Sequence, residues 1–315
     1  MDTRTAAATT TAGAAATAAT AAPEPAPETK GLPHTDYGAH TWLELRELAR
    51  RDDLVVVIPT ATLEDHGYHL PIDTDVRLIE AIARSAVKRC NAEARGGAAM
   101  LFPTAVHGYT PHHMDFPGTV SLRWNVFVES LLDCGRSLCR HGFDRILILN
   151  GHGSNAPLVD LAARLINVEH RGAVAMASTL YLTTPESIQT LTEERASEPG
   201  GMSHACELET SLYLALAPEQ VQMDKAVREI PAWNQNVWSD WPGSGPLSYM
   251  PHWSGLSRSG VMGDPTAATA EKGRVLLERA RREAVDFIAE AASRPRAPGA
   301  DRHHDNPRSE PWPER

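Results

Sequence analysis

Residues 54–75 read Leu-Val-Val-Val-Ile-Pro-Thr-Ala-Thr-Leu-Glu-Asp-His-Gly-Tyr-His-Leu-Pro-Ile-Asp-Thr-Asp, an apolar run followed at once by a turn-rich loop of acids and imidazoles. The run from Leu54 to Ile58 is short and continuously apolar, which is typical of a strand that a parallel sheet buries on both faces. Glu64, His66 and Asp75 come directly after it, and α/β proteins bind ligands at the carboxyl ends of such strands. This stretch therefore predicts an α/β domain with a metal-competent site beyond its first strand.

Strands and helices alternate along the rest of the chain. Apolar residues between Ile79 and Cys90 recur at helical spacing, which predicts a helix directly after the opening loop. Further strands are predicted near 98–103, over 145–150 and over 174–180, and further helices over 124–141, 155–169, 207–216 and 266–293. Strands that alternate with helices imply a mostly parallel sheet with helices on both of its faces.

The length and composition predict one catalytic domain between two tails. A chain of 315 residues with 42% hydrophobic content can bury one large core. Residues 1–35 are mostly Ala, Thr and Pro, with little apolar surface to offset the entropy of ordering, so we expect a disordered tail. We expect a single domain over 36–294 and a second disordered tail over 295–315.

Charge and cysteine usage restrict the partners and the compartment. The formal net charge of -10 argues against nucleic acid or an anionic membrane surface as the main partner, because both require clustered Lys and Arg. A small-molecule or peptide substrate fits better. The four cysteines form no C-x-x-C pair, so we interpret them as reduced thiols and expect a cytoplasmic protein.

Two of the predicted strands lead into segments with metal-binding side chains. Glu64 and His66 are two residues apart, so in an extended segment both face the same side. Asp75 stands at the start of the following helix, where it either turns an oxygen toward a site or serves only as an N-cap. His152 lies between two glycines directly after the strand 145–150. A helix N-terminus that binds an anion is the competing interpretation there, but no basic partner accompanies it.

A third segment, His204-Ala-Cys-Glu-Leu-Glu-Thr-Ser211, adds an imidazole and two carboxylates within six residues. Mixed His, Asp and Glu ligation without thiolate suits Zn²⁺, Mn²⁺ or Fe²⁺. The surplus of carboxylates suits a pair of metal ions that one carboxylate bridges.

Four stretches together resemble the creatininase (creatinine amidohydrolase-like) family, in the order in which the family carries them. They are Ile-Pro-Thr-Ala-Thr-Leu-Glu-Asp-His-Gly-Tyr-His-Leu-Pro-Ile-Asp-Thr-Asp (58–75), Phe-Pro-Gly-Thr-Val-Ser-Leu (116–122), Leu-Asn-Gly-His-Gly-Ser-Asn (149–155) and His-Ala-Cys-Glu-Leu-Glu-Thr-Ser-Leu (204–212). The resemblance implies that Glu64, His66, Asp75 and His152 are metal ligands and that Asp75 bridges two metals. It also implies a three-layer α/β/α sandwich and a homo-oligomer, often a hexamer.

One departure from the family pattern changes the expected ligand set. Creatininase itself carries a ligating glutamate where this chain has Ser154, so we expect Glu207 to be the fifth ligand, with Glu209 as the alternative or as a supporting carboxylate. Creatininase also closes over its substrate with tryptophans, and this chain has Gly200 and the segment 179–181 in rough register with them. The chain therefore resembles a Gly-His-Gly subgroup rather than creatininase itself.

The resemblance implies a metal-dependent amidohydrolase that cleaves the C–N bond of a small cyclic or linear amide, other than a typical peptide bond, by a metal-bridging hydroxide. Two divalent ions, Zn and/or Mn with Fe as a further option, would polarise the carbonyl. His204 is the expected catalytic proton shuttle, and Glu209 is a second catalytic candidate. The weaker candidates for the substrate pocket are His113, or its neighbour His112, with Cys206 and Tyr181. The alternative for either histidine is an ordinary polar loop residue. The alternative for Cys206 is a small buried thiol that only fills space.

Two further hypotheses remain open. The first is a peptidase or deformylase in a cofactor or natural-product pathway. The second belongs to a different class, a non-catalytic metal-binding oligomeric scaffold, against which the retained ligands and His204 argue. The tryptophans of the segment 232–265 are interpreted either as a substrate-facing lid or as an oligomer interface: Trp233, Trp238, Trp241 and Trp253.

Overall fold

The structure is a computed structural model, and it describes residues 32–93, 97–232, 239–241, 243–244 and 246–296. The two expected tails therefore lie outside the described residues, except for 32–35 and 295–296. Among the helices of the described part, none has both the length and the apolar character needed to cross a membrane.

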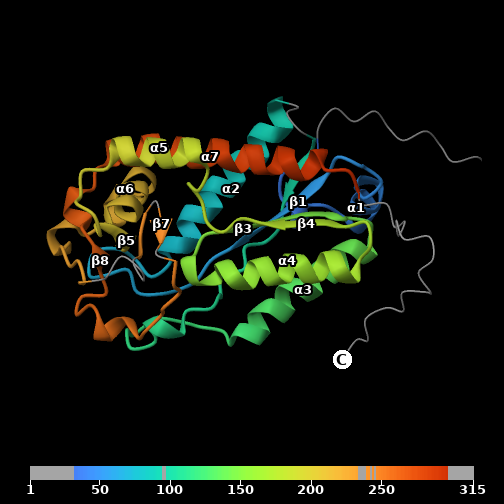
Figure 1. Ribbon diagram of the computed structural model, residues 1–315. Helices are drawn as coiled ribbons and strands as arrows, with labels where there is room; N and C mark the ends of the chain where they lie inside the picture. Colours follow the sequence, from blue (N-terminus) through green and yellow to red (C-terminus); the bar gives the residue numbers. More distant parts are fainter. Residues whose placement is uncertain (1–31, 94–96, 233–238, 242, 245, 297–315) are drawn as a thin grey trace, which may run out of the picture. The chain divides into compact units, whose positions relative to one another are not determined.

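A four-stranded parallel sheet forms the centre of the fold (Figure 1). Its strands are β1 (Val55–Thr60), β2 (Ala99–Leu101), β3 (Arg145–Asn150) and β4 (Val174–Ala177). They lie in the order β2-β1-β3-β4, and each neighbouring pair is parallel. The predicted parallel α/β fold is thus confirmed. The predicted second and fourth strands were too long at their ends.

Both faces of the sheet are buried, which explains the continuous apolar runs. In β1, Val55 and Val57 pack on one core cluster, while Val56 and Ile58 pack on another on the opposite face. Successive side chains of a strand point to opposite faces, so a central strand needs apolar residues at every position. Each fully buried valine or isoleucine contributes about 1.5–3 kcal/mol relative to an exposed one.

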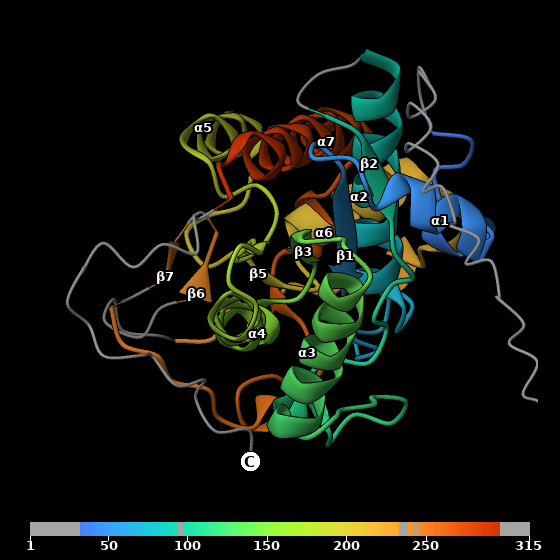
Figure 2. The ribbon, with the colours of Figure 1, turned by 90° about the vertical axis from the view of Figure 1, so that its right-hand side faces the viewer.

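Helices cover both faces and complete the three layers (Figure 1). One core cluster joins the sheet to α2 (Thr74–Glu93), α5 (Pro185–Glu194), α6 (Glu207–Leu216) and α7 (Ala270–Ser293). The other joins it to α3 (Trp124–Arg140) and α4 (Ala156–Glu169). Figure 2 shows α7 and α4 on opposite sides of the strands.

Two helices were not predicted, although each carries a start signal. The first, α1 (Trp42–Leu48), begins with a capping box, in which Thr41 accepts from the backbone N–H of Glu44 and the Glu44 side chain accepts from that of Thr41. The second, α5, begins with Thr184 as N-cap and Pro185 in the first turn. Helix α7 starts four residues later than predicted, because a 3-10 turn over Pro265–Ala267 precedes it.

The segment 232–265 is only partly described, and in it Trp233 and Trp238 lie outside the described residues. The rest forms a short hairpin, β6 (Ser239–Asp240) with β7 (Gly243–Ser244), and then a 3-10 turn at Trp253–Gly255. A last strand, β8 (Met262–Gly263), pairs antiparallel with β5 (Met202–His204). Strand β5 leads within three residues into α6.

Candidate active site

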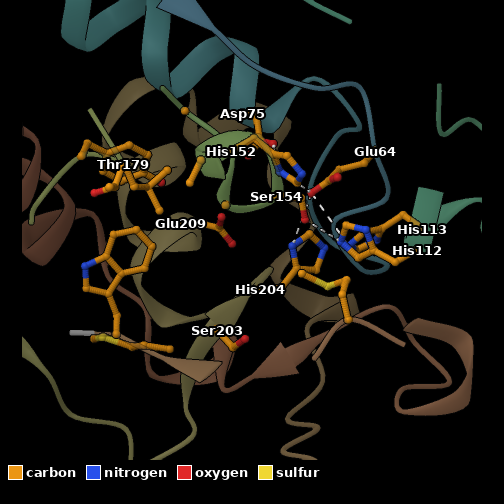
Figure 3. A pocket seen from close by; sticks show the side chains of 18 of the residues that line it. Glu64, Asp75, His112, His113, His152, Ser154, Thr179, Ser203, His204 and Glu209 are labelled. Carbon is orange, nitrogen blue, oxygen red and sulfur yellow. Dashed lines mark hydrogen bonds and ion pairs between the residues drawn. The ribbon is translucent and has the colours of Figure 1, made fainter. Parts of the chain in front are cut away.

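A cavity of about 400 Å³ lies beyond the carboxyl ends of β1, β3 and β4 (Figure 3). The carboxylate and imidazole side chains that meet at its centre come from four separate segments. The polar side chains that line the cavity include Glu64, Asp75, His112, His113, His152, Ser154, His204 and Glu209. Leu180, Tyr181, Met202, Trp241, Met250 and Trp253 form the apolar and aromatic part. The three segments that the sequence predicts to meet at this edge of the sheet do meet there.

Glu64 is the centre of the histidine cluster. Its Oε1 lies 3.2 Å from Nδ1 of His152, 3.6 Å from Nδ1 of His204 and 3.9 Å from Nε2 of His113. Figure 3 shows these imidazoles facing the Glu64 carboxylate from different elements. This oxygen is buried and has no hydrogen-bond partner among the described residues, while the other oxygen accepts a short hydrogen bond from Thr110. A buried carboxylate oxygen surrounded by imidazole nitrogens is the environment that a divalent cation completes.

Asp75 lies between two histidines. Its Oδ2 is 3.0 Å from Nδ1 of His152, and its Oδ1 is 3.4 Å from Nε2 of His66. Thr62 donates a further hydrogen bond of 2.8 Å to Oδ2. Asp75 is the second residue of α2 rather than its N-cap, and both of its oxygens turn toward the cluster.

The electrostatics of this cluster favour positive charge at its centre. Burial opposes ionisation of Asp75, but the two imidazoles outweigh it and lower the pKa of the carboxyl. Burial also disfavours a charged imidazole, yet Glu64 and Asp75 raise the pKa of His152 to about 10. For His66, Asp75 and Glu209 outweigh burial in the same way and raise the pKa. The carboxylates of this cluster therefore stabilise a positive charge placed beside them.

The structure contradicts the expectation that Glu207 is the fifth ligand. Its carboxylate accepts hydrogen bonds from the backbone N–H groups of Ala196 and Ser197, at 2.9 and 2.8 Å, and it forms an ion pair of 2.5 Å with Lys272. Residues 207 and 209 differ by about 200° around a helix, so they cannot face the same side. Glu207 therefore connects the start of α6 to neighbouring segments, and it is not among the described residues that line the cavity.

Glu209 occupies the place that was expected for Glu207. It lines the cavity, and its Oε1 is 3.8 Å from Nε2 of His66. His66, His204 and Glu209 also form one of the groups whose potential ligand atoms all lie within 4.8 Å of one another. The alternative that the sequence left open is thus the one that the geometry favours.

His204 ends β5 and turns its ring into the cavity. Its Nε2 lies 2.8 Å from the backbone carbonyl of Asp65, so Nε2 carries the proton and Nδ1 faces Glu64. Burial, with the charge on His66, lowers the pKa of His204 well below the ordinary range. Ala205 follows with φ of 49°, a left-handed conformation that turns the chain sharply into α6. A neutral imidazole with an unprotonated Nδ1 can accept a proton.

Of the weaker candidates for the substrate pocket, some line the cavity and one does not. His113 and Tyr181 line the cavity, as does His112, which contacts the Ser154 hydroxyl at 3.3 Å. Cys206 does not belong to the cavity wall formed by the described residues: it is buried behind Glu209, with its Sγ 3.8 Å from that carboxylate. The plain interpretation as a small buried thiol fits it better.

Asp65 was not predicted to be a site residue, and the sequence left two interpretations of the tryptophans. Asp65 stands between two predicted ligands, and its carboxylate contacts His113, which is 48 residues away. Of the tryptophans, Trp241 stacks on Tyr181 at a ring distance of 5.6 Å, and Trp253 packs against His113 at 4.9 Å. In the sequence, only the concentration of tryptophan in one segment indicated that these residues could form the aromatic part of the cavity wall.

Comparisons with known proteins agree with this geometry. The family described as creatinine amidohydrolase (creatininase) matches residues 38–288. The mycofactocin precursor peptide peptidase of Mycobacterium tuberculosis (strain CDC 1551 / Oshkosh) is 32% identical over 222 residues, which cover 70% of this chain and 78% of that protein.

Solved structures of creatininase show the same fold. A crystal structure of creatinine amidohydrolase (creatininase) matches with a TM-score of 0.67 and 25% identity, over 84% of this chain and all of that one. A structure of creatininase with Mn matches with a TM-score of 0.65 and 25% identity, over 82% of this chain and 99% of that one. With the fold, the cluster around Glu64 and Asp75 and the match over residues 38–288 in agreement, the chain belongs to the creatininase family.

Proposed function

We propose that the chain is a metal-dependent hydrolase that cleaves the C–N bond of an amide in this cavity. The observation that carries the proposal is the position of Asp75, whose two oxygens lie 3.0 and 3.4 Å from nitrogens of His152 and His66. A carboxylate shared by two imidazoles, with a further carboxylate on either side, is suited to bridge two cations. The domain over 36–294 would carry the whole of this site.

The residues fit a pair of divalent ions. Glu64, Asp75 and His152 would hold one ion, and His66, Asp75 and Glu209 would hold the other. Two buried atoms that face the cluster have no hydrogen-bond partner among the described residues, namely Glu64 Oε1 and His66 Nε2. Oxygen and imidazole donors without thiolate suit Zn²⁺ or Mn²⁺, and Fe²⁺ is also compatible. When bound, such ions polarise a carbonyl and lower the pKa of water.

His204 would move the proton in this reaction. Its Nε2–H is held by the Asp65 carbonyl, so Nδ1 is the atom that accepts a proton from the attacking water and passes it to the leaving nitrogen. The lowered pKa of His204 keeps Nδ1 unprotonated at neutral pH. The apolar part of the cavity, which includes Trp241 and Met250, would exclude bulk water around the substrate.

Peptide cleavage is the second candidate function. The identity to a mycofactocin precursor peptide peptidase supports it, as does a cavity of about 400 Å³, which is large enough for one end of a peptide. In either case we propose a cytoplasmic homo-oligomer, a hexamer by family resemblance. Exposed apolar residues such as Trp42 and Trp124, which are 69% and 56% exposed, support an interface.

The test is a hydrolysis screen of the metal-loaded protein against lactams, hydantoins, formamides and short peptides, with His204→Asn as the paired variant. Hydrolysis of one class by the wild type, and its loss in the variant, is the expected result. Turnover of short peptides alone would select the peptidase over the small-amide hydrolase. Failure on every class with both ions bound would favour the scaffold hypothesis.

A further inference from the structure

Asp65 and His113 form a buried carboxylate–imidazole pair beside the metal cluster. Oδ2 of Asp65 lies 2.5 Å from Nδ1 of His113, and both side chains are buried. The other carboxylate oxygen accepts a hydrogen bond of 3.2 Å from the backbone N–H of Gly67. The position of the His113 ring is therefore fixed from one side by a carboxylate that is itself held.

The surrounding backbone leaves room for this carboxylate. Gly260 has φ of 85°, and a Cβ at that position would overlap Oδ1 of Asp65. A side chain at position 260 would therefore displace the carboxylate. The backbone N–H of Asp65 also donates to the hydroxyl of Thr119 at 3.2 Å. Three segments that are far apart in sequence thus fix the pair in place.

The second nitrogen of His113 faces the cluster. Because Nδ1 contacts Asp65, Nε2 is the atom directed at Glu64, 3.9 Å from Oε1. Glu64, His113 and His204 are all buried, and their potential ligand atoms lie within 4.8 Å of one another. A histidine that contacts a carboxylate through one nitrogen and faces a metal site through the other has the arrangement of most metal-ligating histidines.

The proposed ligand set leaves the ion at Glu64 with a single imidazole. Glu209 takes the place of the carboxylate that Ser154 does not supply, and it lies beside His66, at the other ion. The ion at Glu64 would have Glu64, Asp75 and His152 from the protein. Two further imidazoles face Glu64, those of His113 and His204, and Nδ1 of His204 is already assigned to proton transfer.

We propose that His113 is an additional ligand of the ion at Glu64 and that Asp65 is the residue that positions it. This inference rests on the proposed function, because it presumes a metal ion in the cluster. It deepens that proposal by giving the ion at Glu64 two imidazoles, His113 and His152, which shifts the preference of the site from Mg²⁺ or Ca²⁺ toward Zn²⁺.

The test is a titration of the metal-free protein with Zn²⁺ against a chromophoric chelator of known affinity. His113→Gln should weaken one of the two Zn²⁺ ions by about 10–100-fold, and Asp65→Ala should weaken the same ion. Asp65→Asn, which keeps an oxygen acceptor for Nδ1, should restore part of the affinity. The matched control is His112→Gln, on the same turn and in the same cavity wall, which should bind both ions as the wild type does.

Wild-type affinity for both ions in His113→Gln would overturn the inference, and so would equal losses in His112→Gln and His113→Gln. X-ray absorption of the zinc-loaded wild type gives an answer even if the variants fail to fold, because it counts the imidazole ligands of the bound zinc. We expect a total of three imidazole ligands for the two ions. A total of two would contradict the proposal. A wild type that binds no Zn²⁺ at all would instead remove the proposed function itself.

Discussion

At the residue scale, the two glutamates at the start of α6 have separate tasks. Glu209 faces the cavity beside His66, whereas Glu207 faces Lys272 and the backbone of Ser197. Glu209→Gln should therefore lose one of the two ions, because an amide oxygen is a far weaker ligand than a carboxylate. Glu207→Gln should keep both. Metal analysis by plasma mass spectrometry after dialysis measures the difference.

The reverse pattern, with the ion lost from Glu207→Gln and kept in Glu209→Gln, would restore the original sequence-based assignment of Glu207. Both variants should first be shown to have native circular dichroism, since Glu207 also supports the fold.

His204 allows a second prediction at this scale. Its Nδ1 is the proposed site of proton transfer, and it is not counted among the ligands. His204→Asn should lower kcat by about 10²–10⁴-fold, the usual contribution of general acid–base catalysis. Its metal content should stay at the wild-type value. An equal loss of metal and activity would make His204 a ligand instead.

At the scale of elements, α6 and α7 approach each other closely at Gly273. A Cβ added there would overlap the backbone oxygen of Ser211. Gly to Ala within a helix ordinarily stabilises by about 1 kcal/mol. Here the clash should reverse the sign and destabilise by about 1–3 kcal/mol, as overpacking does. Urea denaturation measures the change. The control is Gly38→Ala, whose new Cβ would meet no atom of the described residues within 4 Å.

A gain of stability in Gly273→Ala would show that the two helices can separate without cost, contrary to their packing in one core cluster.

Buried Glu207 links α6 to α7 through the half-buried Lys272, and to the segment after α5 through the backbone of Ala196 and Ser197. Burial raises the pKa of Glu207, but the contacts with Lys272, Ser197 and Ala196 outweigh it, so the pKa is lowered on folding. A carboxyl group of this kind stabilises the fold above its ordinary pKa and loses that contribution as the pH falls. Glu207→Gln should therefore be less stable by about 1–3 kcal/mol at pH 7.

That difference should shrink as the pH falls below the ordinary range of glutamate, because wild-type Glu207 then becomes neutral as well. Denaturation curves of wild type and variant between pH 7 and acid measure it. A difference that does not change with pH would assign the stabilisation to hydrogen bonding alone.

At the scale of the whole molecule, the parts predicted best from the sequence are those with strong local patterns. The strand Arg145–Asn150 and the helix Glu207–Leu216 have the predicted bounds. A buried strand needs apolar residues at every position, and Pro218 ends the helix after the adjoining Ala217. Helices α1 and α5 were missed because each has only one or two buried residues, so neither carries a strong apolar pattern.

The site was predictable as a set of segments, but its internal contacts were not. Residues at the ends of parallel strands meet at one sheet edge, which places Glu64 and His152 together. The choice between Glu207 and Glu209 depends on which face of α6 turns toward the cavity, and the bounds of the helix, although predicted correctly, do not decide that. The pairing of Asp65 with His113 depends on a loop path that no periodicity records.

We propose above all that amide hydrolysis in this cavity depends on two divalent ions, which Asp75 would bridge. The most direct measurement is the number of bound divalent ions per chain, with hydrolysis, in wild type, Asp75→Ala and the control Asp73→Asn, whose carboxylate contacts Arg77 and Tyr213 outside the cluster. We predict two ions and activity in wild type and control, and loss of both ions and of activity in Asp75→Ala. Full activity with unchanged metal content in Asp75→Ala would contradict the account.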